Sequence, residues 1–283
     1  MAKILITGSN GMLAYDLIPI LQQSYEVVGY DRELLDITNI ENIKTILEKE
    51  QVSIIINCAA YTNVDAAEDE GKLVNYQVNA FGIYLLAKIC KNMDIDLIHI
   101  STDYVFDGTK KSGYLPQDIP NPINQYGMAK YLGEQLLKSE YPNAILVRTS
   151  WLYGGGSQFK NFVNTMLKLA ETRNELKVVN DQFGSPTYSK DLSKAILDII
   201  NNIGNYRGNI FHLCNQTQGN GITWYDFAQE IFRLTQKNID CQRCTSEEFL
   251  TKAKRPQYSK LTNDNEIVLR SWKEGLEEYV KYI

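Results

Sequence analysis

The chain has 283 residues, of which 44% are hydrophobic and 22% charged, a composition that excludes disordered, collagen-like and coiled-coil proteins. Its formal net charge is −5, which argues against nucleic acid as a partner because nucleic-acid-binding proteins usually carry a basic excess. The sequence contains no apolar run long enough to cross a bilayer. The apolar N-terminal stretch is short and is broken by Gly8 and Asn10, so we expect no signal peptide, no membrane partner and a cytoplasmic protein.

Five cysteines and two histidines leave little scope for a metal centre. Cys241 and Cys244 are the only pair at ligand spacing, and they have neither a second pair nor a nearby histidine, so we expect no closed zinc site. A CxxC can also be a redox site, but that motif belongs near the start of a helix in a thioredoxin-like unit, whereas this one lies late in a polar stretch. We therefore expect ordinary free thiols in a reducing compartment.

In the first half of the chain, short runs rich in Ile and Val alternate with longer segments of helical spacing. The runs show little apolar–polar alternation, which is typical of strands buried on both faces. Pro19 should remove one hydrogen bond from the first predicted helix, but the apolar side chains around it still form one face. The alternation predicts an α/β fold with a Rossmann-type doubly wound parallel sheet; its strands are expected at 3–7, 26–30, 53–57, 97–101 and 144–149.

After about residue 150 the pattern loosens. A helix near 189–202 and a strand at 209–213 predict that the chain returns to the sheet. We therefore expect a larger sheet domain of residues 1–150 plus about 189–214, and a smaller, largely C-terminal lobe of about 151–188 plus 215–283. The other elements expected are a helix near 158–172, a strand at 176–180, a turn at 181–187, and short helices in the polar remainder.

The first predicted strand runs into the segment GSNGMLA at 8–14 and then into a helix. Glycines permit a sharp turn and a close approach to a pyrophosphate, and a helix N-terminus offers free N–H groups to the anion. Two glycines also occur in plain turns, but their place between strand and helix favours a dinucleotide site. Farther on, Asp31 suits the ribose hydroxyl of NADH, whereas Arg32 suits the 2′-phosphate of NADPH. Both cofactors stay open, as does the alternative of two solvated charges in a turn.

Tyr126 and Lys130 are four residues apart and lie on one face of a predicted helix. A neighbouring cation lowers a phenol pKa and so suits the phenol to proton transfer. Such pairs arise by chance, and we interpret Tyr84 and Lys88 as one on a helix surface. Thr102 ends the fourth predicted strand, where ligands bind in doubly wound sheets. We therefore expect Thr102, Tyr126 and Lys130 to surround a reactive carbonyl, although Thr102 alone could be a strand-end cap.

With these and further segments, the chain resembles the dTDP-4-dehydrorhamnose reductase family of extended short-chain dehydrogenases/reductases over essentially its whole length. The resemblance implies NAD(P)H-dependent reduction of the 4-keto group of dTDP-4-dehydro-6-deoxy-L-mannose to dTDP-L-rhamnose, which serves cell-surface polysaccharide synthesis. A reductase of another nucleotide-linked 4-keto sugar and a non-catalytic cofactor-binding regulatory subunit stay open, because fold does not fix function. The segments are GSNGMLA at 8–14, NCAAYTNVDAAE at 57–68, STDYVFDG at 101–108, YGMAK at 126–130, RTSWLYG at 148–154, NDQFGSPT at 180–187 and RPQYSKL at 255–261.

The resemblance also implies roles for single residues. Tyr126 would protonate the keto oxygen, Thr102 would hydrogen-bond it, and Lys130 would hold the nicotinamide ribose and lower the pKa of Tyr126. The substrate would also meet Asp103 and Trp151, and the segments at 180–187 and 255–261 would shape its pocket from the second lobe. For Trp151, Arg255 and Asn180, ordinary packing or capping is the alternative. The cofactor-binding residues would be Gly8, Asn10, Gly11, Met12, Leu13, Asp31, Arg32, Asp36, Ile37, Ala59, Ala60, Tyr61, Thr62, Tyr126 and Lys130.

Some members of the resembling family bind Mg²⁺ at a contact between two copies of the chain. The resemblance thus raises Mg²⁺ and a homodimer as partners, in addition to a dTDP-sugar. We assign no metal ligands, because carboxylate sites outside an EF-hand loop leave little spacing signature. The acidic run 68–70 is interpreted as a solvated helix face.

Overall fold

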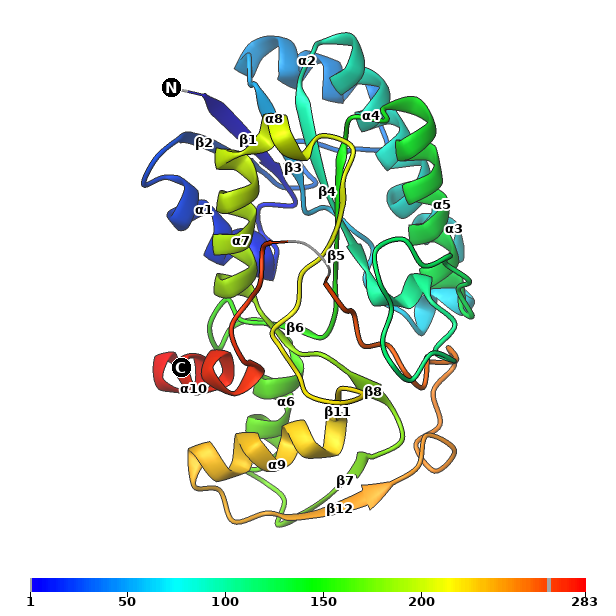
Figure 1. Cartoon of the computed structure of the whole chain (residues 1–283), viewed down its shortest axis with the longest axis vertical. Coiled ribbons are helices and arrows are strands. Elements are labelled where there is room, and N and C mark those ends of the chain that lie inside the picture. Colours follow the sequence, from blue (N-terminus) through cyan, green and yellow to red (C-terminus); the bar gives the residue numbers. More distant parts are fainter. Residues whose placement is uncertain (1, 264–265) are drawn as a thin grey trace.

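The computed structural model describes residues 2–263 and 266–283. A six-stranded sheet fills the upper part of the molecule in Figure 1, and smaller elements lie below it. Every neighbouring pair of strands in this sheet is parallel, which confirms the doubly wound sheet. Its order is β10-β5-β4-β3-β1-β2, and its strands are β1 (Lys3–Thr7), β2 (Glu26–Tyr30), β3 (Ile54–Asn57), β4 (Asp96–Thr102), β5 (Ile145–Thr149) and β10 (Ile210–His212).

Helices cover both faces of this sheet. Successive strand side chains point to opposite faces, so Ile4 and Ile6 join the core beneath α1 and α7, whereas Leu5 joins the core beneath α2 and α4. Pro19 lies within α1, as the apolar face predicted. The bounds are α1 (Met12–Leu21), α2 (Ile40–Glu50), α3 (Lys72–Tyr76), α4 (Gly82–Asn92), α5 (Gln125–Glu140), α7 (Ser189–Asn201) and α8 (Ile203–Tyr206). The short 3₁₀ helices are η1 (Ala66–Glu68) and η3 (Asp103–Val105), and η2 (Gln77–Phe81) is a π-helix between α3 and α4.

The strand order places a crevice beside β1. From β1 the chain moves to β2 on one side and later to β3 on the other, so the connections that leave the carboxyl ends of β1 and β3 diverge. A crevice at such a reversal is where doubly wound sheets bind ligands. The segments that follow β1, β2 and β3 therefore meet at one edge of the sheet.

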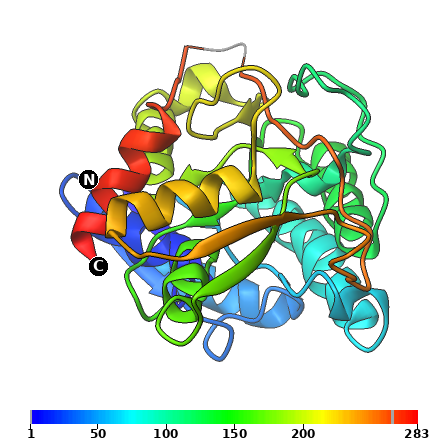
Figure 2. The same cartoon turned by 90° about the horizontal axis from the view of Figure 1, so that it is seen from below.

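The lower part of the molecule is built from three helices and three two-stranded pairs (Figure 2). An aromatic cluster that includes Tyr153, Tyr188, Phe227 and Tyr279 forms its core. The helices are α6 (Phe162–Leu169), α9 (Trp224–Thr235) and α10 (Trp272–Tyr282); the pairs are β7 (Glu175–Val179) with β12 (Asp240–Cys244), β8 (Phe183–Gly184) with β11 (Ile222–Thr223), and β6 (Leu152–Tyr153) with β9 (Thr187–Tyr188). The boundaries of the two predicted domains stay a prediction.

Three expectations for this part of the chain are wrong in detail. The helix expected near 158–172 is shorter, because the side chain of Asn161 accepts a hydrogen bond from the Asn164 N–H and starts α6 there. The turn expected at 181–187 contains β8 and the start of β9. The polar stretch with the CxxC forms β12, because it pairs along its whole length with β7, and pairing with a partner can override weak local propensity.

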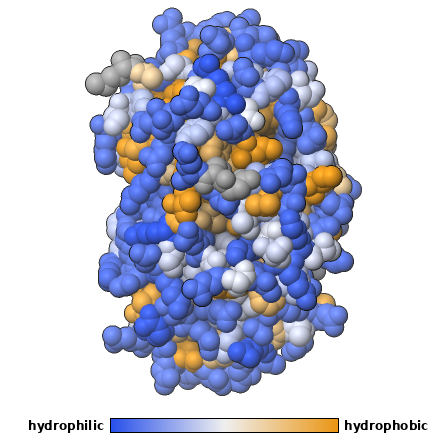
Figure 3. Space-filling view, in the orientation of Figure 1, coloured by the Kyte–Doolittle hydropathy of each residue, from blue (hydrophilic) through white to orange (hydrophobic). Residues whose placement is uncertain are grey.

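The surface in Figure 3 is mostly hydrophilic, with small, separate apolar patches. Among the helices of the described residues, none is both long and apolar enough to span a membrane. All five cysteines are described, and all are free thiols. Cys241 and Cys244 lie on one strand, where side chains three residues apart point to opposite faces, so the two thiols do not form a common site.

Candidate active site

The loop after β1 has the geometry of a phosphate cradle. Gly8 has a φ of +64°, and a Cβ at this position would lie 2.8 Å from the Ala59 nitrogen, so only glycine fits this turn. Gly11 begins α1 without a side-chain cap from the described residues, which leaves the N–H groups of the first turn free. Ala14 is fully buried and lets the helix approach the sheet. These residues fit the pyrophosphate of a dinucleotide.

A cavity of about 470 Å³ lies beside this loop. It is lined by ten of the residues predicted to bind the cofactor: Gly8, Asn10, Gly11, Asp31, Arg32, Asp36, Ile37, Ala59, Ala60 and Tyr61. The sequence analysis missed the apolar lining that Leu35, Val74 and Val78 give the cavity. The spacing of the two valines could have indicated one face of a helix, but not that this face borders the cavity.

Five predicted cofactor residues lie outside this lining: Tyr126 and Lys130, which belong to the catalytic group, and Met12, Leu13 and Thr62. The side chain of Leu13 is in the core beneath α7, so only its backbone is available to a cofactor. Met12 points toward the loop before α6, where its sulfur accepts a hydrogen bond from Asn161. Thr62 is exposed beyond the end of the cavity.

The Asp31 carboxylate is held in place at the end of β2. One oxygen accepts a 2.8 Å hydrogen bond from the Asn10 side chain, and the other accepts the N–H groups of Glu33 and Leu34, each at 3.1 Å. Arg32, by contrast, is exposed. A fixed carboxylate at the rim of the cavity is more than a solvated charge in a turn, and it suits a ribose hydroxyl better than a phosphate.

The residues predicted for catalysis come together at the carboxyl end of β4. Thr102 ends this strand, and its side chain acts to lower the pKa of the Tyr126 phenol, which comes from the first turn of α5. One turn later on α5, the Lys130 amino group donates a 2.7 Å hydrogen bond to the carbonyl of Ile100 on the same strand. All three side chains are at most 9% exposed, so water is largely excluded around them. Their individual roles stay predictions.

The expected lowering of the Tyr126 pKa by Lys130 stays a prediction, and burial is the largest influence on the phenol. Burial raises the pKa of Tyr126 to about 12, against a lowering effect of the hydrogen bond with Thr102. Burial also lowers the pKa of Lys130 to about 8, although Glu134 acts in the opposite direction. The Lys130 amino group donates to the Ile100 carbonyl, and desolvation is the first cause of the raised pKa of the phenol. Tyr126 is therefore protonated at neutral pH, which is the state that a general acid needs.

The two residues predicted to contact only substrate have different surroundings. Asp103 is buried; one carboxylate oxygen accepts a 3.0 Å hydrogen bond from the Thr102 hydroxyl, and the other has no partner among the described residues. Burial raises the pKa of Asp103 to about 6. Trp151 has a φ of +46° and stacks on Trp224 with ring centroids 3.4 Å apart. Trp224 gave no sequence signal, because it belongs to a distant helix.

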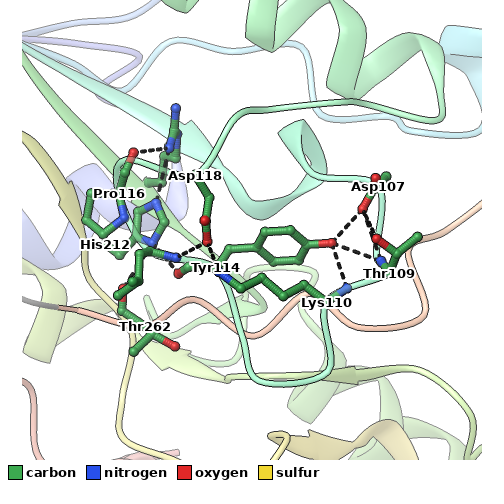
Figure 4. A network of polar contacts seen from close by, with 10 residues as sticks. Asp107, Thr109, Lys110, Tyr114, Pro116, Asp118, His212 and Thr262 are labelled. Carbon is green, nitrogen blue, oxygen red and sulfur yellow. Dashed lines mark hydrogen bonds and ion pairs between the residues drawn. The ribbon is translucent and has the colours of Figure 1, made fainter.

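The loop after Asp103 is fixed by its own polar contacts (Figure 4). The Tyr114 hydroxyl donates to Asp107 at 2.6 Å and accepts the N–H groups of Thr109 and Lys110. Asp118 in turn accepts hydrogen bonds from Lys110 and from the Leu115 N–H. The STDYVFDG segment thus leads from β4 into an ordered loop that holds its strand end in place.

The predicted second-lobe residues have structural partners. Arg255 forms a two-point ion pair with Asp65, with N–O distances of 3.0 and 2.8 Å. The Asn180 side chain accepts a hydrogen bond from Thr223, the cap of α9. Within residues 2–263 and 266–283, no three His, Cys, Asp or Glu side chains gather as metal ligands would, so the expectation of Mg²⁺ gains no support.

Comparisons with known proteins agree with this geometry. The family model described as "RmlD substrate binding domain" matches residues 2–283. A dTDP-4-dehydrorhamnose reductase of Aggregatibacter actinomycetemcomitans is 39% identical, over 92% of this chain and 90% of the relative. A dTDP-4-keto-6-deoxy-D-glucose reductase of Streptomyces niveus is 35% identical, over 96% and 90%.

Among solved structures, the dTDP-4-dehydrorhamnose reductase of Bacillus anthracis in complex with NADP superimposes with a TM-score of 0.92. It is 38% identical to this chain, and the match covers 100% of both chains. The likeness therefore spans the sheet, the cavity beside β1 and the lower part of the molecule. The chain belongs to the RmlD family, which includes these dTDP-4-dehydrorhamnose reductases.

Proposed function

We propose that this chain reduces the 4-keto group of dTDP-4-dehydro-6-deoxy-L-mannose to dTDP-L-rhamnose with NADPH or NADH. The observation that carries the proposal is the meeting of Thr102 and Tyr126, with Lys130 one turn away, at the carboxyl end of β4. Membership of the RmlD family and the reductase relatives support the substrate class.

A bound dinucleotide would supply the hydride, and the chain supplies orientation and a proton. The cavity beside β1 would hold it, with the pyrophosphate at the free N–H groups of α1 and the ribose at Asp31. Tyr126, protonated at neutral pH, gives its proton to the keto oxygen while Thr102 hydrogen-bonds to the same oxygen. The charge on Lys130 stabilises the phenolate that remains.

The proposal is tested by mixing the purified chain with NADPH or NADH and the 4-keto sugar nucleotide, and following cofactor absorbance and product mass. We expect cofactor oxidation only when the keto sugar is present, with a product two mass units heavier because one hydride and one proton are added. Cofactor that binds but is never oxidised, with any keto sugar, would instead support a regulatory subunit.

A second candidate is a reductase of another nucleotide-linked 4-keto sugar. The Streptomyces niveus relative, named for dTDP-4-keto-6-deoxy-D-glucose, supports it, and the chemistry at Tyr126 would be the same. A panel of keto sugars that differ at one stereocentre separates the two candidates: the ratio of kcat/KM values identifies the preferred sugar.

Asp31 determines how well the chain discriminates between the two cofactors. Its carboxylate repels a 2′-phosphate, whereas the exposed Arg32 attracts one. We expect Asp31→Ala to raise the ratio of kcat/KM for NADPH to kcat/KM for NADH by about tenfold, because the repulsion of the 2′-phosphate is removed. We expect Arg32→Ala to lower this ratio, because the attraction of the 2′-phosphate is removed. Steady-state kinetics with both cofactors measures the ratio, and equal ratios in the two variants would contradict this assignment.

A further inference from the structure

A row of four buried polar side chains lies beneath the proposed catalytic group. It begins at Thr7, the last residue of β1, crosses Asn57 on β3 and His99 on β4, and ends at Lys130. The Thr7 hydroxyl lies 2.5 Å from Asn57 Oδ1, Asn57 Nδ2 lies 2.9 Å from His99 Nδ1, and His99 Nε2 lies 3.4 Å from Lys130 Nζ. Each member is at most 2% exposed, so solvent cannot replace these contacts.

The hydrogen-bonding neighbours of these four side chains determine which atom of each contact donates and which accepts. The Ala59 N–H donates to Thr7 Oγ1, so the hydroxyl proton of Thr7 is free to bond to Asn57 Oδ1. The Ala59 carbonyl, which can only accept, lies 3.5 Å from Asn57 Nδ2. The amide of Asn57 therefore presents its NH₂ group to His99, and His99 Nδ1 accepts. A neutral imidazole with an accepting Nδ1 has its proton on Nε2, which faces Lys130.

An N–H that points at Lys130 restricts what the amino group can do. It cannot accept from an ammonium, so the Lys130 protons are directed to the Ile100 carbonyl, at 2.7 Å, and to the site beyond. Burial, together with the charge on Lys130, lowers the pKa of His99 well below 6.5, so His99 stays neutral.

The other groups that face Lys130 come from several elements. Glu134 lies one turn along α5, where Arg148 and Ser101 hold its carboxylate. Cys58 follows β3 and is the other titratable group that acts on Lys130.

We propose that His99, with its tautomer fixed by Asn57 and Thr7, is a positioning residue that orients the Lys130 amino group toward the reaction site. This inference rests on the proposed reductase function for its kinetic consequence, but not for its structural content. The row of side chains connects β1, after which the phosphate loop begins, with Lys130 through the strands β1, β3 and β4.

The tautomer is tested first, without any substrate. The chain has two histidines, so protein labelled with ¹⁵N-histidine gives two imidazole systems in a long-range ¹H–¹⁵N spectrum, and His212→Gln assigns them. We expect His99 to be neutral at pH 6 with its proton on Nε2, and the proton to move to Nδ1 in Asn57→Asp, whose carboxylate can only accept. A wild-type His99 protonated on Nδ1 would overturn the proposal.

Two variants then separate positioning from mere packing. In His99→Gln the amide nitrogen reaches the place of Nε2, whereas in His99→Asn the side chain reaches only the place of Nδ1. We expect the Gln variant to keep kcat within about threefold and the Asn variant to lose about tenfold or more, as misplaced catalytic groups do. The alkaline limb of kcat/KM should also move to higher pH in the Asn variant, because Lys130 no longer faces an N–H. If the two variants have equal kcat values and the alkaline limb of kcat/KM does not move, His99 has only a structural role.

His212 provides the matched control. It is buried on β10, and its Nδ1 lies 2.9 Å from the Tyr114 carbonyl (Figure 4). Its Nε2 lies 3.2 Å from a cation, Arg148, as His99 Nε2 lies near Lys130. His212→Asn and His212→Gln should change thermal stability and should move the pH profile less than His99→Asn does, because His212 reaches Lys130 only through Arg148 and Glu134. If wild-type protein reduces no keto sugar, the proposed function fails, while the tautomer and the pH dependence of NADH binding still decide the role of His99.

Discussion

Burial, rather than a neighbouring charge, sets the state of the Tyr126 phenol. The pKa of about 12 keeps the phenol protonated, which suits reduction because a proton must be given as the hydride arrives. Thr102 acts to lower the pKa of Tyr126 and donates a 3.0 Å hydrogen bond to Asp103. The three side chains therefore act as one unit, and a change in one is felt by the others.

Replacing Tyr126 by Phe should leave cofactor binding nearly unchanged and reduce kcat at least about 100-fold, the usual loss on removing a general acid. Tyr84→Phe is the control, because Tyr84 and Lys88 also lie four residues apart but pair on the surface of α4, with 5.9 Å between the amine and the ring. Stopped-flow turnover and NADH fluorescence measure the two effects. Near wild-type turnover in Tyr126→Phe would assign the acid to another group.

Activity should fall as the pH rises through about 8. The pKa of Lys130 is lowered to about 8 by burial, so its amino group is charged below that pH and neutral above it. Tyr126 stays protonated throughout this range, so the loss above pH 8 belongs to Lys130. The profile of kcat/KM, which reports groups of the free enzyme, checks this; a flat profile to pH 10 would exclude Lys130 as the titrating group.

At the scale of elements, the start of α5 determines where the catalytic side chains point. The side chain of Asn124 accepts the Gly127 N–H at 2.7 Å and donates to the Lys254 carbonyl at 2.8 Å. Glu68 accepts the Gln125 N–H at 2.8 Å. The expectation that the acidic run 68–70 is only a solvated face is therefore wrong for Glu68, which caps a helix distant in sequence.

Asn124→Ala should cost about 1 kcal/mol of unfolding free energy, the usual value of an N-cap, and should also lower kcat because Tyr126 lies two residues away. Ser271→Ala is the control, since Ser271 caps α10 in the lower part of the molecule by accepting the Lys273 N–H. Denaturant unfolding and turnover are measured on both variants. A loss of stability without loss of kcat in Asn124→Ala would contradict the positioning role of this cap.

At the scale of the whole molecule, ion pairs join two segments that are far apart in the sequence. Arg255 follows β12 in the chain, and Asp65 follows β3, yet their side chains form two hydrogen bonds. Lys252 pairs with Asp69 beside them at 2.7 Å. These contacts hold the RPQYSKL segment against the end of the sheet where α5 begins.

Arg255→Met should raise the KM for the sugar nucleotide, because the segment predicted to shape the substrate pocket loses its anchor. It should cost at most about 1 kcal/mol of stability, since the Asp65 side chain is 40% exposed and exposed pairs contribute little. Arg207→Met removes a similar two-point pair with Asp96 in the sheet domain and serves as the control. An unchanged KM in Arg255→Met would show that the segment is held by its other contacts.

The sequence alone determined the parallel sheet, the loop that follows β1 and the three residues at the end of β4. Buried parallel strands are continuous apolar runs, and the glycines and the Tyr126–Lys130 spacing are local signals. It did not predict β12, the stack of Trp151 on Trp224, the cap from Glu68 or the place of His99 between Asn57 and Lys130. Each of these depends on a partner far away in the chain, and the pKa of Tyr126 depends on burial that only the folded chain provides. Long-range contact and desolvation are properties of the tertiary structure, so no local pattern records them.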